Sequence, residues 1–380
     1  MIHVYSSDMQ GAPALSYASG SLVNVLDACL VTGFNLSPIT TIEVAAGIAT
    51  ATVTAGHGLK PPVRIKISGH ASLNGTYPAF STPSPTTFTF PAAVPDGSYP
   101  GGSVSVSAAG WQKVFSATGT AVYRSLDTLS TQTLFRIEQS GWSGYVNAYE
   151  TMSDINTGTG KFTALNADKG DTFYCTYPST ATTPRAWWVV ATESLVVLWV
   201  ARGFADASIL SGIGGTLFGD VPPLFGYDLS AAFIPNESFT AAVSDAPLDT
   251  GAQQIIMRRG LNQDPGPVSG TLTTPFGRAS VGTGLVMGAQ TENRLLISEI
   301  TAMDFNYSTT ITPRGVLPYL YMCPLGFADS SYYPPGTTFA GAAGSAAEGK
   351  TFWCVPLGRN DSTPSSRKRA FVDVSELTQP

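Results

Sequence analysis

The stretch AWWVVATESLVVLWVA, residues 186–201, decides the fold. It contains two apolar runs, residues 186–190 and 195–200, which are separated by the polar residues 192–194. Both runs are rich in Val and Trp, as β-strands are. Because neither run alternates apolar with polar residues, we expect both strands to be buried on both faces. The sequence therefore predicts a pair of central strands in the main body of the protein.

Shorter runs that alternate apolar and polar residues, or end beside Pro or Gly, recur along the chain. Those with the length of a strand include residues 120–124, 133–137, 145–149 and 316–321. Residues 22–30 instead have apolar side chains at helical spacing, with Ser19 or Ser21 as the expected N-cap and Gly33 just beyond the end. The sequence thus predicts a mainly β protein, with a β-sandwich or barrel-like main body and one short N-terminal helix.

Residues 39–108 differ in texture from their surroundings. Several short alternating strands follow one another there between turns, and no charged side chain occurs between Lys66 and Asp96. In the strand at residues 63–67 we expect the apolar side chains to point inward and the charged ones, Arg64 among them, to point outward. This pattern predicts a small β-sandwich or barrel.

The domain organisation follows from this change of texture. We predict a main β body formed by residues 1–38 and 109–380, with an inserted small β-domain at residues 39–108. A further division of the body is a candidate near residues 205–270. Because the two ends of an insertion must lie close together, we expect the inserted domain to project from the body.

The composition excludes several classes of protein. Lys and Arg number 20 and Asp and Glu 26, and charged residues make up 12% of the chain, against roughly 25% in ordinary soluble domains. An acidic chain without a basic stripe is unsuited to binding nucleic acid by neutralising phosphates. No run approaches the roughly 18 apolar residues of a membrane span, and the first residues lack the pattern of a signal peptide. We therefore expect a folded, weakly charged protein that binds no nucleic acid and spans no membrane.

The four cysteines are far apart and form no Cys-x-x-Cys pair: Cys29, Cys175, Cys323 and Cys354. Such spacings are typical neither of a disulfide framework nor of a zinc site. We predict buried free thiols of a protein made in a reducing cytoplasm, with a single disulfide as the open alternative.

Residues 344–351, GSAAEGKT, match the pattern of a phosphate-binding loop. Such a loop needs a buried strand before it and a helix after it, because the N-terminus of that helix faces the phosphates. Residues 340–343 are not strand-like, and residues 352–356 are β-like and end in proline. We therefore predict that this match is accidental.

No set of side chains has the spacing of a catalytic or metal site. His3, His57 and His70 are the only histidines; none has a second ligand at helical spacing, and the last two lie in turn-like stretches. A glycoside hydrolase needs two carboxyl groups about 5–9.5 Å apart, for which the candidates are Glu150, Asp154, Asp168 and Asp171. Turn and surface positions account for these carboxylates more simply. We predict no catalytic, cofactor-binding or metal-binding residues and no cofactor.

Three weaker patterns point to binding. Asp220 in the triplet 218–220, with Tyr227 and Asp228, suggests a polar cluster, and residues 168–171 suggest a cation loop that lacks the calcium pattern. The six tryptophans suggest a sugar-binding platform. Turn-forming aspartates, and core packing of Trp188 and Trp199, are the simpler interpretation.

Two sets of motifs resemble structural proteins of tailed bacteriophages. The insertion resembles a small β-module that is common in such proteins. The similar stretches are residues 47–52, 56–59, 63–69, 73–77 and 87–90. The remainder is similar to a phage structural protein of the tail region at residues 1–34, 110–115, 121–125, 149–160, 218–220 and 314–321. The resemblance spans nearly the whole chain and involves non-catalytic motifs, so it implies a virion protein and assigns no functional residue.

The resemblance and the composition together favour a non-enzymatic virion protein. We expect a tail or baseplate component (a ring, adaptor or fibre attachment) that is assembled in the bacterial cytoplasm and located in the virion. Its partners would be other virion proteins and further copies of itself, since low charge with abundant Thr, Gly and aromatic residues suits such interfaces. A capsid decoration protein is a second interpretation. A carbohydrate-binding or carbohydrate-active protein that recognises a host surface glycan is a third.

Overall fold

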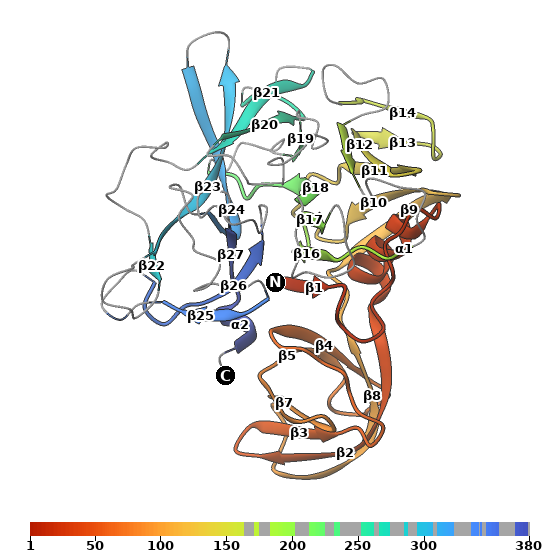
Figure 1. Ribbon diagram of the computed structural model, residues 1–380, viewed down its shortest axis with the longest axis vertical. Helices are drawn as coiled ribbons and strands as arrows, with labels where there is room; N and C mark the ends of the chain where they lie inside the picture. The colour runs from red at the N-terminus through yellow and green to blue at the C-terminus, as the bar shows by residue number, and fades with distance from the viewer. Residues whose placement is uncertain are drawn as a thin grey trace.

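Antiparallel sheets form nearly all of the regular structure in the computed structural model of this chain (Figure 1). The residues that the structure describes are 1–162, 171–174, 183–201, 213–224, 232–235, 252–261, 266–273, 285–287, 295–306, 310–322, 336–341, 343, 347–356 and 369–378. Within these residues the strands form sheets of thirteen, seven and five strands and a two-stranded ribbon. The prediction of a mainly β protein is confirmed.

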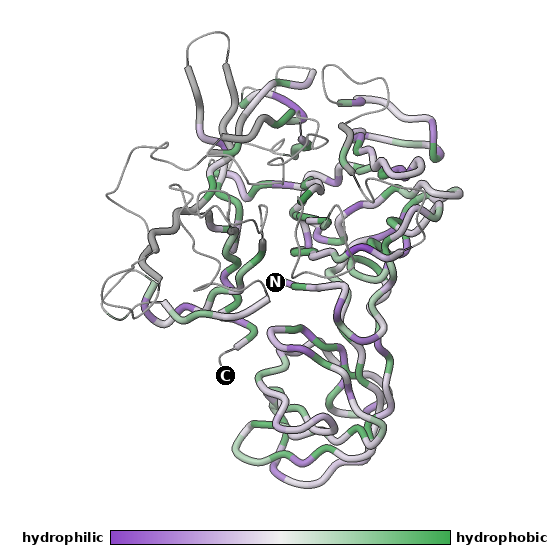
Figure 2. Tube along the Cα trace, in the orientation of Figure 1, coloured by the Kyte–Doolittle hydropathy of each residue, from purple (hydrophilic) through white to green (hydrophobic). Residues whose placement is uncertain are grey.

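The largest sheet contains the two apolar runs. Trp187–Ala191 (β16) and Leu195–Ala201 (β17) are buried along their whole length, as is the next strand, Ile213–Asp220 (β18). β17 lies between β16 and β18, and Figure 2 shows how apolar this region is. Gly215 permits the close approach of β18, because a Cβ there would lie 1.9 Å from the Leu198 carbonyl oxygen. The predicted pair of buried strands is confirmed.

The other strands of this sheet come from both ends of the chain. His3–Ser6 (β1) pairs with β16, and the sheet continues beyond β18 in the order β19, β20, β21, β23, β24, β27, β26 and β25, with β22 beside β23. Their bounds are Ala232–Pro235 (β19), Ala252–Met257 (β20), Val268–Thr273 (β21), Leu285–Met287 (β22), Leu295–Asn306 (β23), Thr310–Met322 (β24), Thr338–Ala340 (β25), Thr351–Pro356 (β26) and Arg369–Asp373 (β27). A short second helix, Ser375–Thr378 (α2), which the sequence did not predict, follows β27.

The five-stranded sheet packs beside the largest sheet. Its strands, in spatial order, are Asp171–Tyr174 (β15), Ser143–Tyr149 (β12), Leu134–Ser140 (β11), Thr120–Ser125 (β10) and Trp111–Ala117 (β9). Trp111 joins the two sheets, since its ring meets Phe135 and Phe218 edge-on and its Nε1 donates to the Thr192 carbonyl oxygen at 2.8 Å. This packing of one sheet on another gives the body its sandwich character.

The other face of the five-stranded sheet carries a small apolar cluster of its own. Val122, Leu134 and Tyr149 are buried there, with Met152 packed against them. Met152 belongs to the two-stranded ribbon, Thr151–Met152 (β13) and Gly158–Thr159 (β14). The ribbon therefore shields part of this face from water.

The N-terminal helix lies against the five-stranded sheet. It comprises Ser21–Asp27 (α1) and a π-helical turn, Ala28–Thr32 (η1), and it ends where Gly33 takes φ 74°. The predicted end is confirmed, but the predicted serine N-cap is wrong. Gly20 precedes the helix in a left-handed conformation, and the Ser21 hydroxyl donates to the Ser16 carbonyl oxygen instead, at 2.6 Å.

The seven-stranded sheet lies entirely between residues 34 and 106 and forms the lower lobe in Figure 1. Its strands, in spatial order, are Gly75–Ala79 (β5), Val63–Ser68 (β4), Gly97–Val106 (β8), Phe34–Ala45 (β2), Ile48–Thr52 (β3), Thr87–Pro91 (β7) and Ser81–Ser84 (β6). The long strands β2 and β8 pair with each other and connect this lobe to the body. The separate folding of residues 39–108 stays a prediction, and the candidate division near residues 205–270 lies largely outside the described residues.

The base of this lobe shares its core with the body. Ile65 and Ile67 of β4 belong to the same contiguous cluster of buried side chains as Tyr5 of β1. The strand β4 alternates as predicted except at Arg64, which is 6% exposed and not outward-facing. The prediction for Arg64 is wrong because this edge of the lobe faces the body and not water.

The packing of Trp111 yields a test by substitution. Replacing Trp111 with Ala removes the indole between the two sheets and leaves the Thr192 carbonyl without its donor, so we expect the free energy of unfolding to fall by about 3–5 kcal/mol. Trp142→Ala is the matched control, because Trp142 is 42% exposed and its loss should cost less than about 1 kcal/mol. Urea denaturation of the purified chains measures both, and equal losses would contradict this packing.

Candidate functional site

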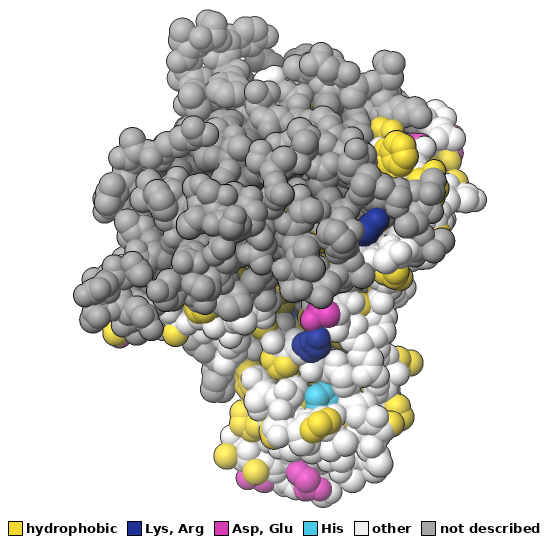
Figure 3. Space-filling view, viewed as in Figure 1, with side chains coloured by type: hydrophobic (Ala, Val, Ile, Leu, Met, Phe, Trp, Pro, Cys, Tyr) yellow, Lys and Arg dark blue, Asp and Glu magenta, His cyan; other side chains and the backbone are white. Residues whose placement is uncertain are grey.

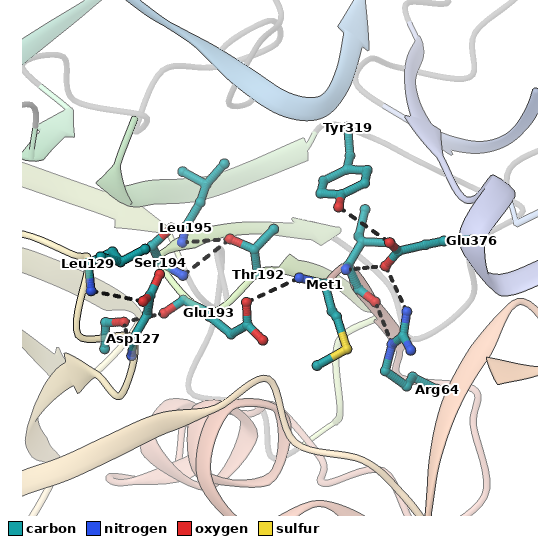
Figure 4. A network of polar contacts seen from close by, with 12 residues as sticks. Met1, Arg64, Asp127, Leu129, Thr192, Glu193, Ser194, Leu195, Tyr319 and Glu376 are labelled. Atoms are coloured by element: carbon teal, nitrogen blue, oxygen red, sulfur yellow. Dashed lines mark hydrogen bonds and ion pairs between the residues drawn. The ribbon is translucent and has the colours of Figure 1, made fainter. Parts of the chain in front are cut away.

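An extended network of polar contacts lies where the lobe formed by residues 34–106 meets the body (Figure 4). We call it the junction network and define it by Met1, Ile2, Arg64, Glu193, Tyr319 and Glu376. These residues come from the N-terminus, β4, the turn between β16 and β17, β24 and α2. The network therefore joins five segments that are far apart in the sequence.

The Glu376 carboxylate is at the centre of this network. Its Oε1 accepts hydrogen bonds from the Ile2 backbone N–H at 2.6 Å and from Arg64 Nη2 at 2.7 Å. Its Oε2 accepts a bond from the Tyr319 hydroxyl at 3.3 Å. Arg64 Nε in turn donates to the Ile2 carbonyl oxygen at 3.2 Å. Each partner of Glu376 thus belongs to a different part of the fold.

Burial sets the protonation of the neighbouring groups. Burial, Arg64 and the N-terminal ammonium together lower the pKa of His3 to about 3, so this imidazole is neutral. Burial and the adjacent Glu376 raise the pKa of Tyr319 to about 12, which keeps its hydroxyl as a donor. The Met1 ammonium is paired with Glu193 at 3.1 Å, and both groups are more than a third exposed. The network is built to hold segments together, and it brings no base next to a nucleophile.

A second network connects the five-stranded sheet to the largest sheet. Glu150, which follows β12, accepts hydrogen bonds from Arg259 Nε at 2.8 Å and Nη2 at 2.9 Å and from Arg258 Nε at 3.1 Å. Burial acts to raise the pKa of Glu150, but the two guanidinium groups outweigh it and lower the pKa. Arg258 Nη1 also donates to the Thr131 carbonyl oxygen at 3.0 Å. Glu150 is therefore an ionised partner of two arginines, which excludes it as the acid that a glycoside hydrolase needs.

Asp220 holds the loop between β10 and β11. It is 8% exposed and accepts bonds from the Thr131 backbone N–H at 2.6 Å and hydroxyl at 2.7 Å. Burial raises the pKa of Asp220 to about 6, against the lowering effect of the Thr131 bonds and of Arg258. The sequence favoured a turn-forming aspartate here over a polar cluster. That interpretation is wrong, because Asp220 is the last residue of β18 and binds Thr131 of the loop between β10 and β11. Tyr227 and Asp228, the other residues suggested for the cluster, lie outside the described residues.

The two remaining histidines each accept hydrogen bonds that stabilise a turn. His57 Nδ1 accepts the Leu59 N–H at 2.9 Å, which leaves Nε2 to donate to the Ser84 carbonyl oxygen at 2.9 Å. His70 Nδ1 accepts the N–H groups of Ser72 and Leu73, both at 3.0 Å. The interpretation of both residues as turn imidazoles is confirmed.

Of the other carboxylates proposed from the sequence, Asp154 lies exposed in the bend between β13 and β14. Asp154 caps its own turn by accepting the N–H groups of Asn156 and Thr157, and these bonds lower its pKa. Asp168 lies outside the described residues, and Asp171 begins β15. Within the described residues, no group of three or more His, Cys, Asp or Glu side chains is placed to hold a metal ion.

The match to a phosphate loop is followed by strand β26, as predicted, and not by a helix. Its lysine, Lys350, is paired with Asp373 at 3.0 Å and donates to the Tyr321 hydroxyl at 3.0 Å. Burial opposes the charge on Lys350, but these two partners outweigh it and raise the pKa. The lysine thus connects β26 to β27 and β24.

Two cysteines named from the sequence lie in the core of the protein. Cys29 and Cys354 are buried and form no disulfide, as predicted, whereas Cys175 and Cys323 lie outside the described residues. Trp188 and Trp199 are core residues, as predicted. No helix among the described residues is long and apolar enough to cross a membrane.

Sequence reasoning missed Glu376 and Arg258, which belong to no motif. Arg64 is 312 positions from Glu376, and Glu150 is 108 positions from Arg258. The doubled charge at Arg258 and Arg259 was the one available signal, since charged residues make up only 12% of this chain. A comparison with protein-family models and with curated proteins found no match to the chain.

The junction network predicts that Glu376→Gln is destabilising. The substitution leaves the buried Arg64 guanidinium without its counter-charge, so we expect a loss of about 2–4 kcal/mol in the free energy of unfolding. The control is Glu193→Gln, which removes an exposed ion pair and should cost less than about 1 kcal/mol. A second substitution, Arg64→Met, should recover part of the loss in the Glu376→Gln chain. Urea denaturation at neutral pH measures these losses. Equal losses in Glu376→Gln and Glu193→Gln would contradict the network.

Asp220 predicts a pH dependence of stability. Its folded-state pKa of about 6 lies above the ordinary 3.8, so its contribution is fully present below about pH 4 and is lost as the pH rises through 6. The loss amounts to about 3 kcal/mol at about 1.4 kcal/mol per pKa unit. We expect the free energy of unfolding, measured from pH 4 to 7, to fall more steeply in the natural chain than in Asp220→Asn. Parallel curves would refute the assignment.

Proposed function

We propose that this chain is a non-enzymatic structural protein of a tailed-bacteriophage virion. It would act as a tail or baseplate component, as a ring, an adaptor or an attachment for fibres. Its partners would be other virion proteins and further copies of the same chain. The motifs that resemble phage structural proteins along nearly the whole sequence are the first support for this proposal.

The observation that carries the proposal is the use of the described ionisable groups. Glu376, Glu150 and Lys350 each bind side chains from other segments of the same chain. An active site instead needs ionisable groups that converge on a substrate with pKa values tuned for the reaction. A chain that uses its few charges to fasten sheets to one another is suited to the role of a building block.

The sheets supply edges through which copies of the chain can associate. Among the described strands, β6, β9 and β25 each have a neighbour on one side only. The free backbone groups of such an edge pair readily with a strand from another chain. This arrangement supports a homo-oligomer that is assembled through β-rich contacts.

The lobe formed by residues 34–106 supports a role at the periphery of an assembly. It extends away from the body, and the face seen in Figure 3 carries few charged side chains. Exposed acidic residues, Glu43 and Asp96, lie towards its far end, where β2 turns into β3 and β8 begins. Such a surface is accessible to a neighbouring subunit or to a host surface.

Particle location tests the proposal directly. We expect mass spectrometry of purified virions to detect the chain, and immunogold labelling to place it on the tail. Label on the head would favour the alternative, a capsid decoration protein. Absence of the chain from washed particles would overturn both assignments.

A further inference from the structure

Trp142 differs from every other tryptophan of the chain. The structure describes all six, and five of them are at most 5% exposed, whereas Trp142 is 42% exposed. It lies in the two-residue turn between β11 and β12, next to Gly141, which takes φ 61°. Leaving a large indole in water forgoes the stabilisation that burial would provide. Trp142 is therefore the tryptophan whose ring is most accessible to a ligand.

The turn that carries Trp142 is held firmly in place. Gln139, which is 4% exposed, donates from Nε2 to the Ser16 carbonyl oxygen at 2.9 Å and to the Gly141 carbonyl oxygen at 3.3 Å. Its Oε1 accepts the Leu22 N–H at 2.9 Å, at the start of helix α1. These bonds connect the turn to the N-terminal segment, and such restraint lowers the entropy that binding would cost.

A second aromatic ring lies beside the indole. The rings of Tyr17 and Trp142 have centroids 6.5 Å apart and planes inclined at 56°. Tyr17 is half-buried and also packs against the turn, since a Cβ on Gly141 would lie 3.3 Å from its ring. Because the planes are strongly inclined, Tyr17 does not lie flat on the indole. The two rings together present an aromatic surface.

Three of the described segments meet at this aromatic pair, and none of the three contains a charged residue. A Cβ on Gly119 would lie 2.8 Å from Ser19 Oγ and 3.1 Å from the Gln139 carbonyl oxygen, so the turn between β9 and β10 meets the other two segments here. Residues 9–26, 114–123 and 139–149 contain no Asp, Glu, Lys, Arg or His. They do contain exposed hydroxyl groups, on Ser19, Thr118 and Ser140.

We propose that Trp142 and Tyr17 form a binding surface for a neutral glycan. A sugar ring has an apolar C–H face that packs on an aromatic ring, and hydroxyl groups at its rim that exchange hydrogen bonds with neutral polar side chains. Nucleic acid would need cationic side chains beside the aromatic rings. A protein partner would need a contact of about 800 Å² per side. The other exposed large apolar residues that the structure describes are on separate segments: Met1, Leu36, Leu126, Leu129 and Leu224.

The test is binding of the purified full-length chain to an array of neutral and acidic oligosaccharides. We expect saturable binding to neutral oligosaccharides of glucose, galactose, mannose or N-acetylglucosamine. Trp142→Ala should weaken it at least about tenfold, and Trp142→Phe should weaken it less because an aromatic face remains. The matched control is Leu129→Ala, since Leu129 is 94% exposed and lies at the opposite end of β11; it should bind as the natural chain does.

Tryptophan fluorescence gives a second readout on the same protein. Acrylamide should quench mainly Trp142, and the neutral oligosaccharide that binds on the array should protect it. The proposal fails if no neutral glycan binds, if only acidic glycans bind, or if Trp142→Ala binds unchanged. It also fails if Trp142→Ala loses contact with another virion protein while the natural chain binds no glycan. These outcomes are independent of where the chain lies in a particle, so this inference can fail while the proposed function stands.

Discussion

The Glu376 carboxylate imposes the main constraint on this fold. Ile2 immediately precedes β1, one end of the largest sheet, and Glu376 follows β27 near the other end. The bond between them requires the sheet to curl until these two regions meet. Arg64 then attaches the lobe formed by residues 34–106 to the same carboxylate. The shape of the body and the position of the lobe therefore depend on one partly buried polar cluster.

Such a cluster specifies geometry more than it stabilises the fold. Removing Arg64 from water costs free energy that its pairing with Glu376 largely restores, so an apolar contact of the same volume would be comparably stable. An apolar contact, however, tolerates sliding and rotation, whereas hydrogen bonds from Nε and Nη2 to different acceptors fix the guanidinium in direction as well as distance. We interpret the junction network as a device that gives the lobe a single orientation.

The parts of the fold that the sequence predicted are those governed by local patterns. The apolar runs at residues 186–201 are β16 and β17 because buried strands need apolar side chains on both faces, and Gly33 ends the N-terminal helix because it adopts positive φ without strain. Arg64 was placed outward by the same alternation rule. That rule predicts the face of the strand on which a side chain lies, but not what packs against that face. The partner of Arg64, Glu376, is 312 positions away.

The same limit applies to the candidate sites. Burial raises the pKa of Asp220, and the Thr131 bonds that oppose this come from 89 positions away, so the residues around Asp220 in the sequence show neither effect. The tryptophans suggested a sugar-binding platform from the sequence, but their number did not distinguish Trp142 from the five buried ones. Exposure separates them, because the five buried indoles belong to strands in the core, whereas Trp142 lies in a turn.

Two surfaces of this chain, the lobe formed by residues 34–106 and the turn that carries Trp142, are both held by hydrogen bonds to other segments. A copy in an assembly contributes to multivalent binding only if its surfaces point in the same direction as those of its neighbours. A surface that is already fixed in the free chain loses less entropy when it binds. The junction network fixes the lobe, and the Gln139 hydrogen bonds fix the turn that carries Trp142. In the symmetric particle that we propose, weak contacts of single sugar rings would be repeated, so a modest aromatic surface on each copy would be sufficient for attachment.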